Sequence, residues 1–130
     1  MRDRQPNKNN PYYLPNSLYR LMLATVRDYD RLCFERDNIL HGGSSAGDGM
    51  PRSTDVGRPT ERKAEKLEYI DRQIDAIDKA LQRIPQEYRL HIFDNIRYGK
   101  LYPVDYAGRN TWSRWKTRFL RYIAENLKFL

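Results

Sequence analysis

Residues 67–84, LEYIDRQIDAIDKALQRI, carry the most regular hydrophobic pattern in the chain. Their apolar side chains follow one another at alternating steps of three and four positions: Leu67, Ile70, Ile74, Ile77, Leu81 and Ile84. This spacing places them on one face of an α-helix, while acidic and basic residues balance one another on the other faces. Because Pro59 suits the first turn of a helix, the stretch predicts an amphipathic helix over 59–84.

A second amphipathic helix is expected upstream, over residues 17–40. Its heptad-like seam consists of Leu18, Met22, Thr25, Tyr29, Leu32, Arg36 and Ile39. Between the two helices, residues 42–58 hold five of the seven glycines but no phosphate-loop motif, so we expect a flexible loop. Two such helices of similar length predict a long antiparallel hairpin over 17–84, which could also form a homodimer as a coiled coil.

The residues before the hairpin have a different character. Residues 1–16 are polar and contain three prolines, so we expect a flexible N-terminal arm. Within it, Tyr12, Tyr13 and Leu14 form a small apolar island that is expected to pack onto the helical body as a minor contact.

Residues 85–130 are predicted to form a helix-turn-helix region. A helix over 85–98 is expected to end at Gly99, and one or two helical turns over 103–107 should follow. A short helix, a turn containing glycine and a longer helix form the order typical of this motif. The whole chain is therefore predicted to be all-α, with a helical hairpin followed by a C-terminal helix-turn-helix.

The last helix of that region is expected over 109–130, with Asn110 or Thr111 as its N-cap. One apolar stripe runs along it: Trp112, Trp115, Phe119, Tyr122, Ile123 and Leu127. The two tryptophans could anchor the helix in the core or stack on nucleic-acid bases, and their spacing favours the core for Trp115.

The net charge of +7 is concentrated in this helix. Residues 109–130 contain six basic residues and one acidic residue, a net charge of +5, while residues 41–108 are neutral as a whole. A neutral body with one basic helix indicates a directed contact with a polyanion, so double-stranded DNA is the expected partner.

The side chains expected to contact DNA lie on the polar side of the same helix. They are Asn110, Thr111, Ser113, Arg114, Lys116, Thr117, Arg118 and Arg121. Arg114 and Arg118 are one turn apart and could reach guanine edges or phosphates, whereas Lys116 and Arg121 are better placed for the phosphate backbone.

Two segments carry a resemblance to a known family. IDKALQRIPQEYRLHIFDNIRYG at 77–99 and TWSRWK at 111–116, continued by Phe119 and Ile123, resemble small phage-encoded transcriptional regulators of the RinA and ArpU type. Those regulators in turn resemble region four of sigma factors. The resemblance covers about residues 60–130 and implies control of late or packaging genes through promoter DNA, with RNA polymerase as a further partner.

The sequence offers no pattern typical of catalysis or of metal binding. His41, His91 and Cys33 lack the spacing of metal ligands, and no nucleophile motif is present, so we expect no enzyme, no cofactor and no metal. A single cysteine fits a reducing cytoplasm, and no segment predicts a signal peptide or a membrane span.

Two other functions remain open at this point. One is a small, terminase-like subunit that recognises phage DNA for packaging. The other is a protein-interaction module, for example an inhibitor of a host protein, which would use the helical hairpin and the basic helix to bind its partner.

Overall fold

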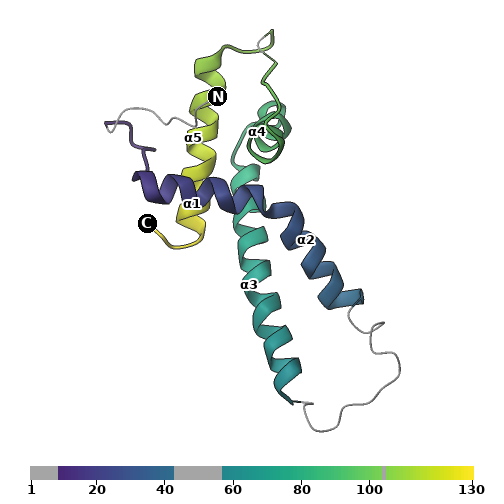
Figure 1. Ribbon diagram of the computed structural model, residues 1–130. Coiled ribbons are helices and arrows are strands. Elements are labelled where there is room, and N and C mark those ends of the chain that lie inside the picture. The colour runs from purple at the N-terminus through teal and green to yellow at the C-terminus, as the bar shows by residue number, and fades with distance from the viewer. Residues whose placement is uncertain (1–8, 43–56, 104) are drawn as a thin grey trace.

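The computed structural model describes residues 9–42, 57–103 and 105–130, and the regular structure within these ranges is entirely helical. Figure 1 shows the arrangement of its helices. They are α1 (Asn16–Arg27), α2 (Tyr29–Asp37), the π-helical turn η1 (Asn38–Gly42), α3 (Gly57–Gln82), α4 (Gln86–Tyr98) and α5 (Arg109–Asn126). The expectation of an all-α protein is thus confirmed, while most of the expected glycine-rich loop lies outside the described residues.

The prediction of a single helix over 17–40 is wrong, because the helix is interrupted at Asp28, which separates α1 from α2. The backbone N–H of Asp28 donates to the carbonyls of Ala24, at 3.0 Å, and Thr25, at 3.2 Å, which tightens the last turn of α1. After this break α2 runs beside α3, whereas α1 crosses the body of the molecule (Figure 1). The antiparallel pairing with α3 is therefore limited to α2.

The break separates two hydrophobic clusters. Helix α1 has four buried side chains: Tyr19, Met22, Leu23 and Val26. All four join a main cluster with side chains of α3, α4 and α5. Leu32 of α2 instead packs with Ile70 and Ile74 of α3 in a second, smaller cluster. One straight helix does not serve both clusters, because α1 and α2 run in different directions (Figure 1).

Helix α3 connects the two clusters through the stripe that the sequence predicts. Ile70 and Ile74 lie in the smaller cluster, whereas Ile77 lies in the main one. Ile84 is buried just beyond the end of the helix, and Leu81 packs half-buried against the main cluster. The far half of α3 projects with α2 away from the body (Figure 1).

Helix α4 ends where the sequence predicts. Gly99 has φ +72°, a left-handed conformation that glycine adopts without strain, and its N–H donates to the carbonyl of Asn95 at 2.9 Å. The buried Asn95 side chain donates in turn to the carbonyl of Lys100 at 2.8 Å. Among the helices of the described ranges, none combines the length and the apolar character needed to cross a bilayer.

Candidate nucleic-acid interface

The basic helix α5 begins at Arg109, and its N-cap is Gly108 rather than Asn110 or Thr111. Gly108 is extended, and its carbonyl accepts from the N–H groups of Thr111, at 3.1 Å, and Trp112, at 3.3 Å. Glycine has no side chain to satisfy the remaining N–H groups, and the first turn contains no acidic residue. The start of α5 therefore keeps the full positive end of the helix dipole.

The short helix expected over 103–107 is wrong for the residues that the structure describes there. Tyr106 donates its N–H to the carbonyl of Pro103 at 3.1 Å in a turn, and Val104 lies outside the described residues. Helices α4 and α5 are thus joined by residues 99–108 rather than by a helix and a tight turn.

Trp112 fixes α5 to this connection. Its side chain is fully buried, and its indole N–H donates to the carbonyl of Ala107 at 3.0 Å. The ring stacks parallel to Tyr102 with 5.0 Å between centroids and meets Tyr88 edge-on at 5.1 Å. Trp112 is therefore a core anchor, and Trp115, half-buried and stacked on Tyr88 at 5.9 Å, serves the core in part.

The exposed side of α5 lies opposite this anchor. Asn110 and Arg114 each lie roughly 160° around the helix from Trp112, and Ser113 lies roughly 100° from it, because an α-helix turns about 100° per residue. All three side chains are exposed, as is Arg109. We call these four residues, Arg109, Asn110, Ser113 and Arg114, the exposed arc; it extends for about 8 Å along the helix.

Three further predicted contact residues lie near the arc: Thr111, Lys116 and Thr117. Their side chains are half-buried or buried, so they add little or nothing to its exposed surface. Thr117 lies one turn beyond Ser113 but is buried, and its hydroxyl donates back to the Ser113 carbonyl at 3.0 Å. Thr117 therefore does not extend the exposed arc. Thr111 and Lys116 are half-buried.

Arg118 and Arg121 hold the N-terminal segment instead of facing outward. The guanidinium carbon of Arg118 lies 4.7 Å from the ring centre of Tyr12 and 4.9 Å from that of Trp115. Arg121 donates to the carbonyl of Tyr13 at 3.3 Å and to the carboxylate of Glu125 at 3.3 Å. Both arginines are half-buried and contact the N-terminal segment, so neither extends the exposed arc.

The N-terminal segment is accordingly part of the fold from Asn9 onward. Leu14 is fully buried, and the ring of Tyr12 meets Tyr122 edge-on at 6.2 Å. The expected packing of the apolar island is confirmed. Residues 1–8 of the expected arm lie outside the described ranges.

Sequence reasoning missed Arg109 as a contact candidate, although it counted toward the charge of the helix. Its position at the first helical residue could have marked it, since cations beside the uncapped start of a helix add to the positive potential there. The single acidic residue of α5, Glu125, lies near its other end, where it also pairs with Arg83 at 3.4 Å. The exposed arc is thus free of acidic side chains within α5.

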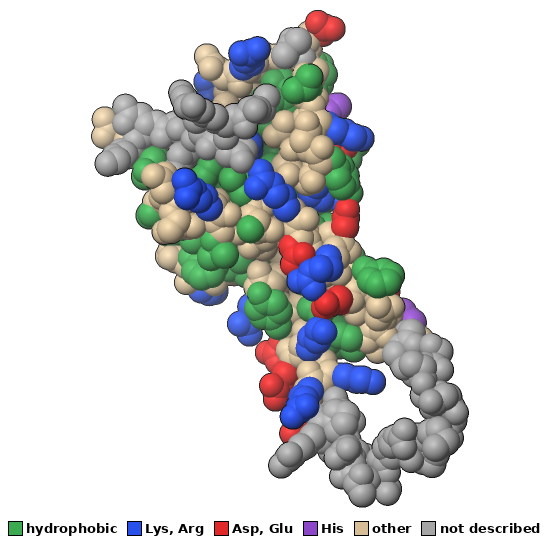
Figure 2. All heavy atoms as spheres, in the orientation of Figure 1, with side chains coloured by type: hydrophobic (Ala, Val, Ile, Leu, Met, Phe, Trp, Pro, Cys, Tyr) green, Lys and Arg blue, Asp and Glu red, His purple; other side chains and the backbone are tan. Residues whose placement is uncertain are grey.

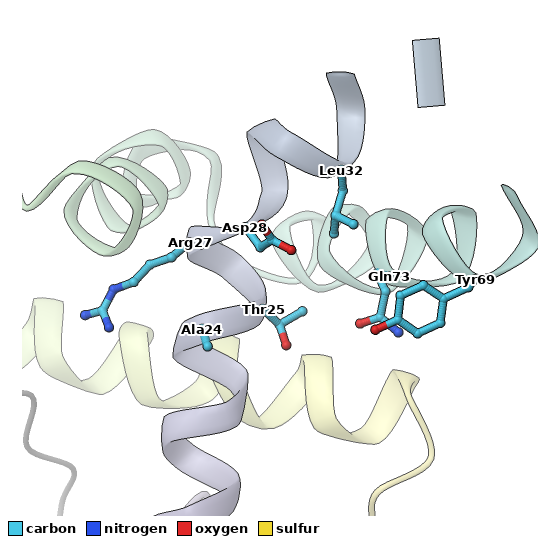
Figure 3. A pocket seen from close by; sticks show the side chains of 7 residues that line it. All are labelled: Ala24, Thr25, Arg27, Asp28, Leu32, Tyr69 and Gln73. Atoms are coloured by element: carbon cyan, nitrogen blue, oxygen red, sulfur yellow. The ribbon is translucent and has the colours of Figure 1, made fainter. Parts of the chain in front are cut away.

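Two hollows lined by described residues contain no comparable constellation. One, of about 460 Å³, lies between α1, α2 and α3, and Thr25, Leu32, Tyr69 and Gln73 surround it (Figure 3). Arg27 points away from this hollow and donates to the Ile96 carbonyl at 3.3 Å. Its charged groups therefore do not converge on a common point.

A second hollow, of about 430 Å³, lies along α3 beside Arg36. Its carboxylates are engaged by neighbours: Asp71 by Arg36 at 3.6 Å, and Asp78 by the Tyr29 hydroxyl at 2.8 Å. Burial and this hydrogen bond raise the pKa of Tyr29. Within the described ranges, no group of His, Cys, Asp or Glu is arranged to hold a metal ion.

Comparison with known proteins adds no family to this description. The chain matches no protein-family model, no curated protein and no solved structure.

Proposed function

We propose that the protein binds double-stranded DNA through the exposed arc at the start of α5. The observation that carries this proposal is the coincidence of three properties on about 8 Å of helix: an uncapped helix start, two exposed arginines, and two exposed polar side chains. Acidic residues of α5 are absent from this stretch, so nothing on the helix competes with phosphate.

Each part of the arc has a distinct task in this proposal. The first-turn N–H groups and Arg109 hold a phosphate, because a helix start favours anions. Asn110, Ser113 and Arg114 meet base edges in the major groove, where Asn pairs best with adenine and Arg with guanine. The buried Trp112 keeps the helix rigid behind them, as a helix that reads bases requires.

A single arc is too short to specify an operator. About 8 Å of helix spans roughly two to three base pairs, because stacked pairs rise about 3.4 Å each. The proposal therefore includes a homodimer through the projecting α2–α3 hairpin, which places two arcs on two half-sites. The role that the resemblance implies, regulation of late phage genes together with RNA polymerase, fits a protein of this kind.

The test is duplex binding across a salt series, comparing the wild type with the Arg109→Gln/Arg114→Gln variant. Each phosphate that the variant no longer neutralises should reduce the slope of log K against log salt by about 0.9. The matched control is Arg20→Gln/Lys128→Gln, which removes the same charge from exposed positions outside both the arc and the hairpin. The proposal is wrong if both variants bind like the wild type or if both weaken equally.

A protein-interaction module is the second candidate, and one observation favours it. Three large apolar side chains are exposed on α1, α2 and α3, namely Leu21, Phe34 and Tyr69, and Tyr69 lies beside the hollow of Figure 3. Exposed apolar side chains are typical of contacts with other proteins where they join into one patch. A stable complex whose formation is insensitive to salt and to Arg109→Gln/Arg114→Gln would support this candidate over DNA binding.

A further inference from the structure

Next to the exposed arc, aromatic rings form a rim around the buried Trp112. Tyr106 lies 6.4 Å from Trp112 and 5.9 Å from Tyr88 between ring centroids, and His91 lies 5.5 Å from Trp112. Tyr106 is 60% exposed and His91 is also exposed, whereas Trp112 is completely covered. The outer rings of this rim are thus available to a ligand, although the tryptophan is not.

Tyr106 is held in place by its neighbours. Its N–H donates to the Pro103 carbonyl, and its ring rests on Tyr88 and Trp112, so part of a fixed ring is left uncovered. Leu101, which is 79% exposed, adds apolar surface in the same connection. Apolar, basic and acidic side chains all lie at this end of the molecule (Figure 2).

The neighbouring charge indicates what would cover this ring. Tyr106 precedes Arg109 by three residues, and the start of α5 carries the positive helix end described above, while the carboxylate of Glu87 lies near the Tyr106 hydroxyl. An aromatic face beside a cationic, uncapped helix start complements a ligand that is flat and apolar at one end and anionic at the other. A nucleotide has this form, with a base that stacks and a phosphate that binds the cation.

We propose that Tyr106 stacks on an unpaired nucleobase, so that the protein prefers DNA with a single-stranded extension over fully paired duplex. A base inside a duplex is covered on both faces by its neighbours, so only an unpaired or terminal base can offer a face to the ring. This inference rests on the proposed DNA binding by the arc, which supplies the phosphate contacts next to the ring.

The experiment compares three labelled DNAs that share one duplex: blunt-ended, extended by single-stranded thymines, and extended by abasic residues. The abasic extension carries the same phosphate charge as the thymine extension but has no rings to stack. The wild type should bind the thymine extension about 5- to 150-fold more tightly than the abasic one, the range expected for one stacked base. Quenching of a 2-aminopurine at the first unpaired position reports the stacking directly.

Three variants assign the effect to the ring. Tyr106→Ala should abolish both the preference and the quenching, while Tyr106→Phe should keep them because it keeps the ring. Phe129→Ala, which removes a comparably exposed ring beyond the end of α5, should leave both unchanged. Thermal unfolding of each variant, measured beside the binding, shows whether Tyr106→Ala retains the fold. If it does not, Tyr106→Leu, which keeps an apolar side chain but has no ring, provides the test and should abolish both the preference and the quenching.

The outcomes separate this inference from the proposed function. If the wild type binds the blunt duplex but binds thymine and abasic extensions equally well, the stacking proposal is wrong and DNA binding by the arc stands. If the preference persists in Tyr106→Ala, another residue provides the stacking and the assignment to Tyr106 is wrong. If no DNA binds at all, both proposals fall together.

Discussion

The guanidinium group of Arg118 lies 4.7 Å from the centre of the Tyr12 ring, so the N-terminal segment and the C-terminal helix are directly joined. The same guanidinium lies 4.9 Å from the ring centre of Trp115. From its position on the helix alone, Arg118 is expected to contact DNA, but its contact with Tyr12 gives it a structural role. It also provides a way to separate stability from binding with two variants of α5.

Arg118→Ala should destabilise the protein by about 1–2 kcal/mol, because it removes two cation–π contacts and the packing of the arginine stem. Arg114→Ala, one turn earlier and exposed, should change the free energy of unfolding by less than about 0.5 kcal/mol. Urea denaturation measures both. The effect on DNA affinity should show the reverse order. When both variants are measured as folded proteins, Arg114→Ala should bind DNA more weakly than Arg118→Ala.

A double-mutant cycle then tests the contact itself. Tyr12→Ala and Arg118→Ala should together cost at least about 0.5 kcal/mol less than the sum of the single variants, because they remove the same interaction. Strict additivity would mean that the two side chains do not stabilise one another.

The contact of Arg118 with Tyr12 also illustrates what the sequence can predict and what it cannot. The stripes of α3 and α5 and the stop at Gly99 follow from local rules of spacing and capping, and the structure contains them. Thr117 and Arg118 lie on the polar side of α5 by spacing alone, yet one is buried and the other is covered by Tyr12. Burial by a segment distant in the sequence leaves no periodic signal.

The break at Asp28 shows the same limit for helices. The heptad-like seam runs past this residue without interruption, and no proline or glycine marks it. The break becomes intelligible only once α1 is seen to pack in the main cluster and α2 in the smaller one. Of the candidate contact residues, Asn110, Ser113 and Arg114 are exposed as expected because they lie away from Trp112 on the helix, which spacing does predict.

The left-handed conformation of Gly99 gives a prediction with an internal control. Gly99→Ala should cost about 1 kcal/mol, since alanine is strained at φ +72° although nothing lies within 4 Å of an added Cβ. Gly108→Ala meets the same open space at φ −73°, so its cost should be clearly smaller. Equal decreases in thermal stability would show that strain at Gly99 is not the cause.

Asp30 gives a prediction about pH. The hydroxyl of Tyr98 and the guanidinium of Arg97 donate to this carboxylate and lower its pKa below the ordinary value. A carboxyl whose pKa is lowered in the folded state stabilises the protein above its unfolded pKa of about 3.9. This stabilisation is lost as the pH falls through the folded-state pKa. Asp30→Asn should therefore be less stable than the wild type at about pH 7, and the difference should shrink below about pH 4. A difference that is constant with pH would contradict the pairing, and Asp37→Asn on the same helix serves as the control.

Substitutions of Gly108, the N-cap of α5, by capping residues should raise the stability of the protein and lower its DNA affinity. Gly108→Asp places a carboxylate where it can accept from the first-turn N–H groups, which should stabilise the protein by about 0.5–1 kcal/mol. The same carboxylate occupies the N–H groups proposed to hold a phosphate and repels the DNA backbone. Gly108→Ser supplies a cap without the charge and should stabilise with a smaller decrease in affinity. Thermal unfolding and duplex titration on the same samples give both quantities. If Gly108→Asp raises stability and leaves DNA affinity unchanged, the start of α5 does not meet the phosphate backbone, and the DNA-binding face must lie elsewhere.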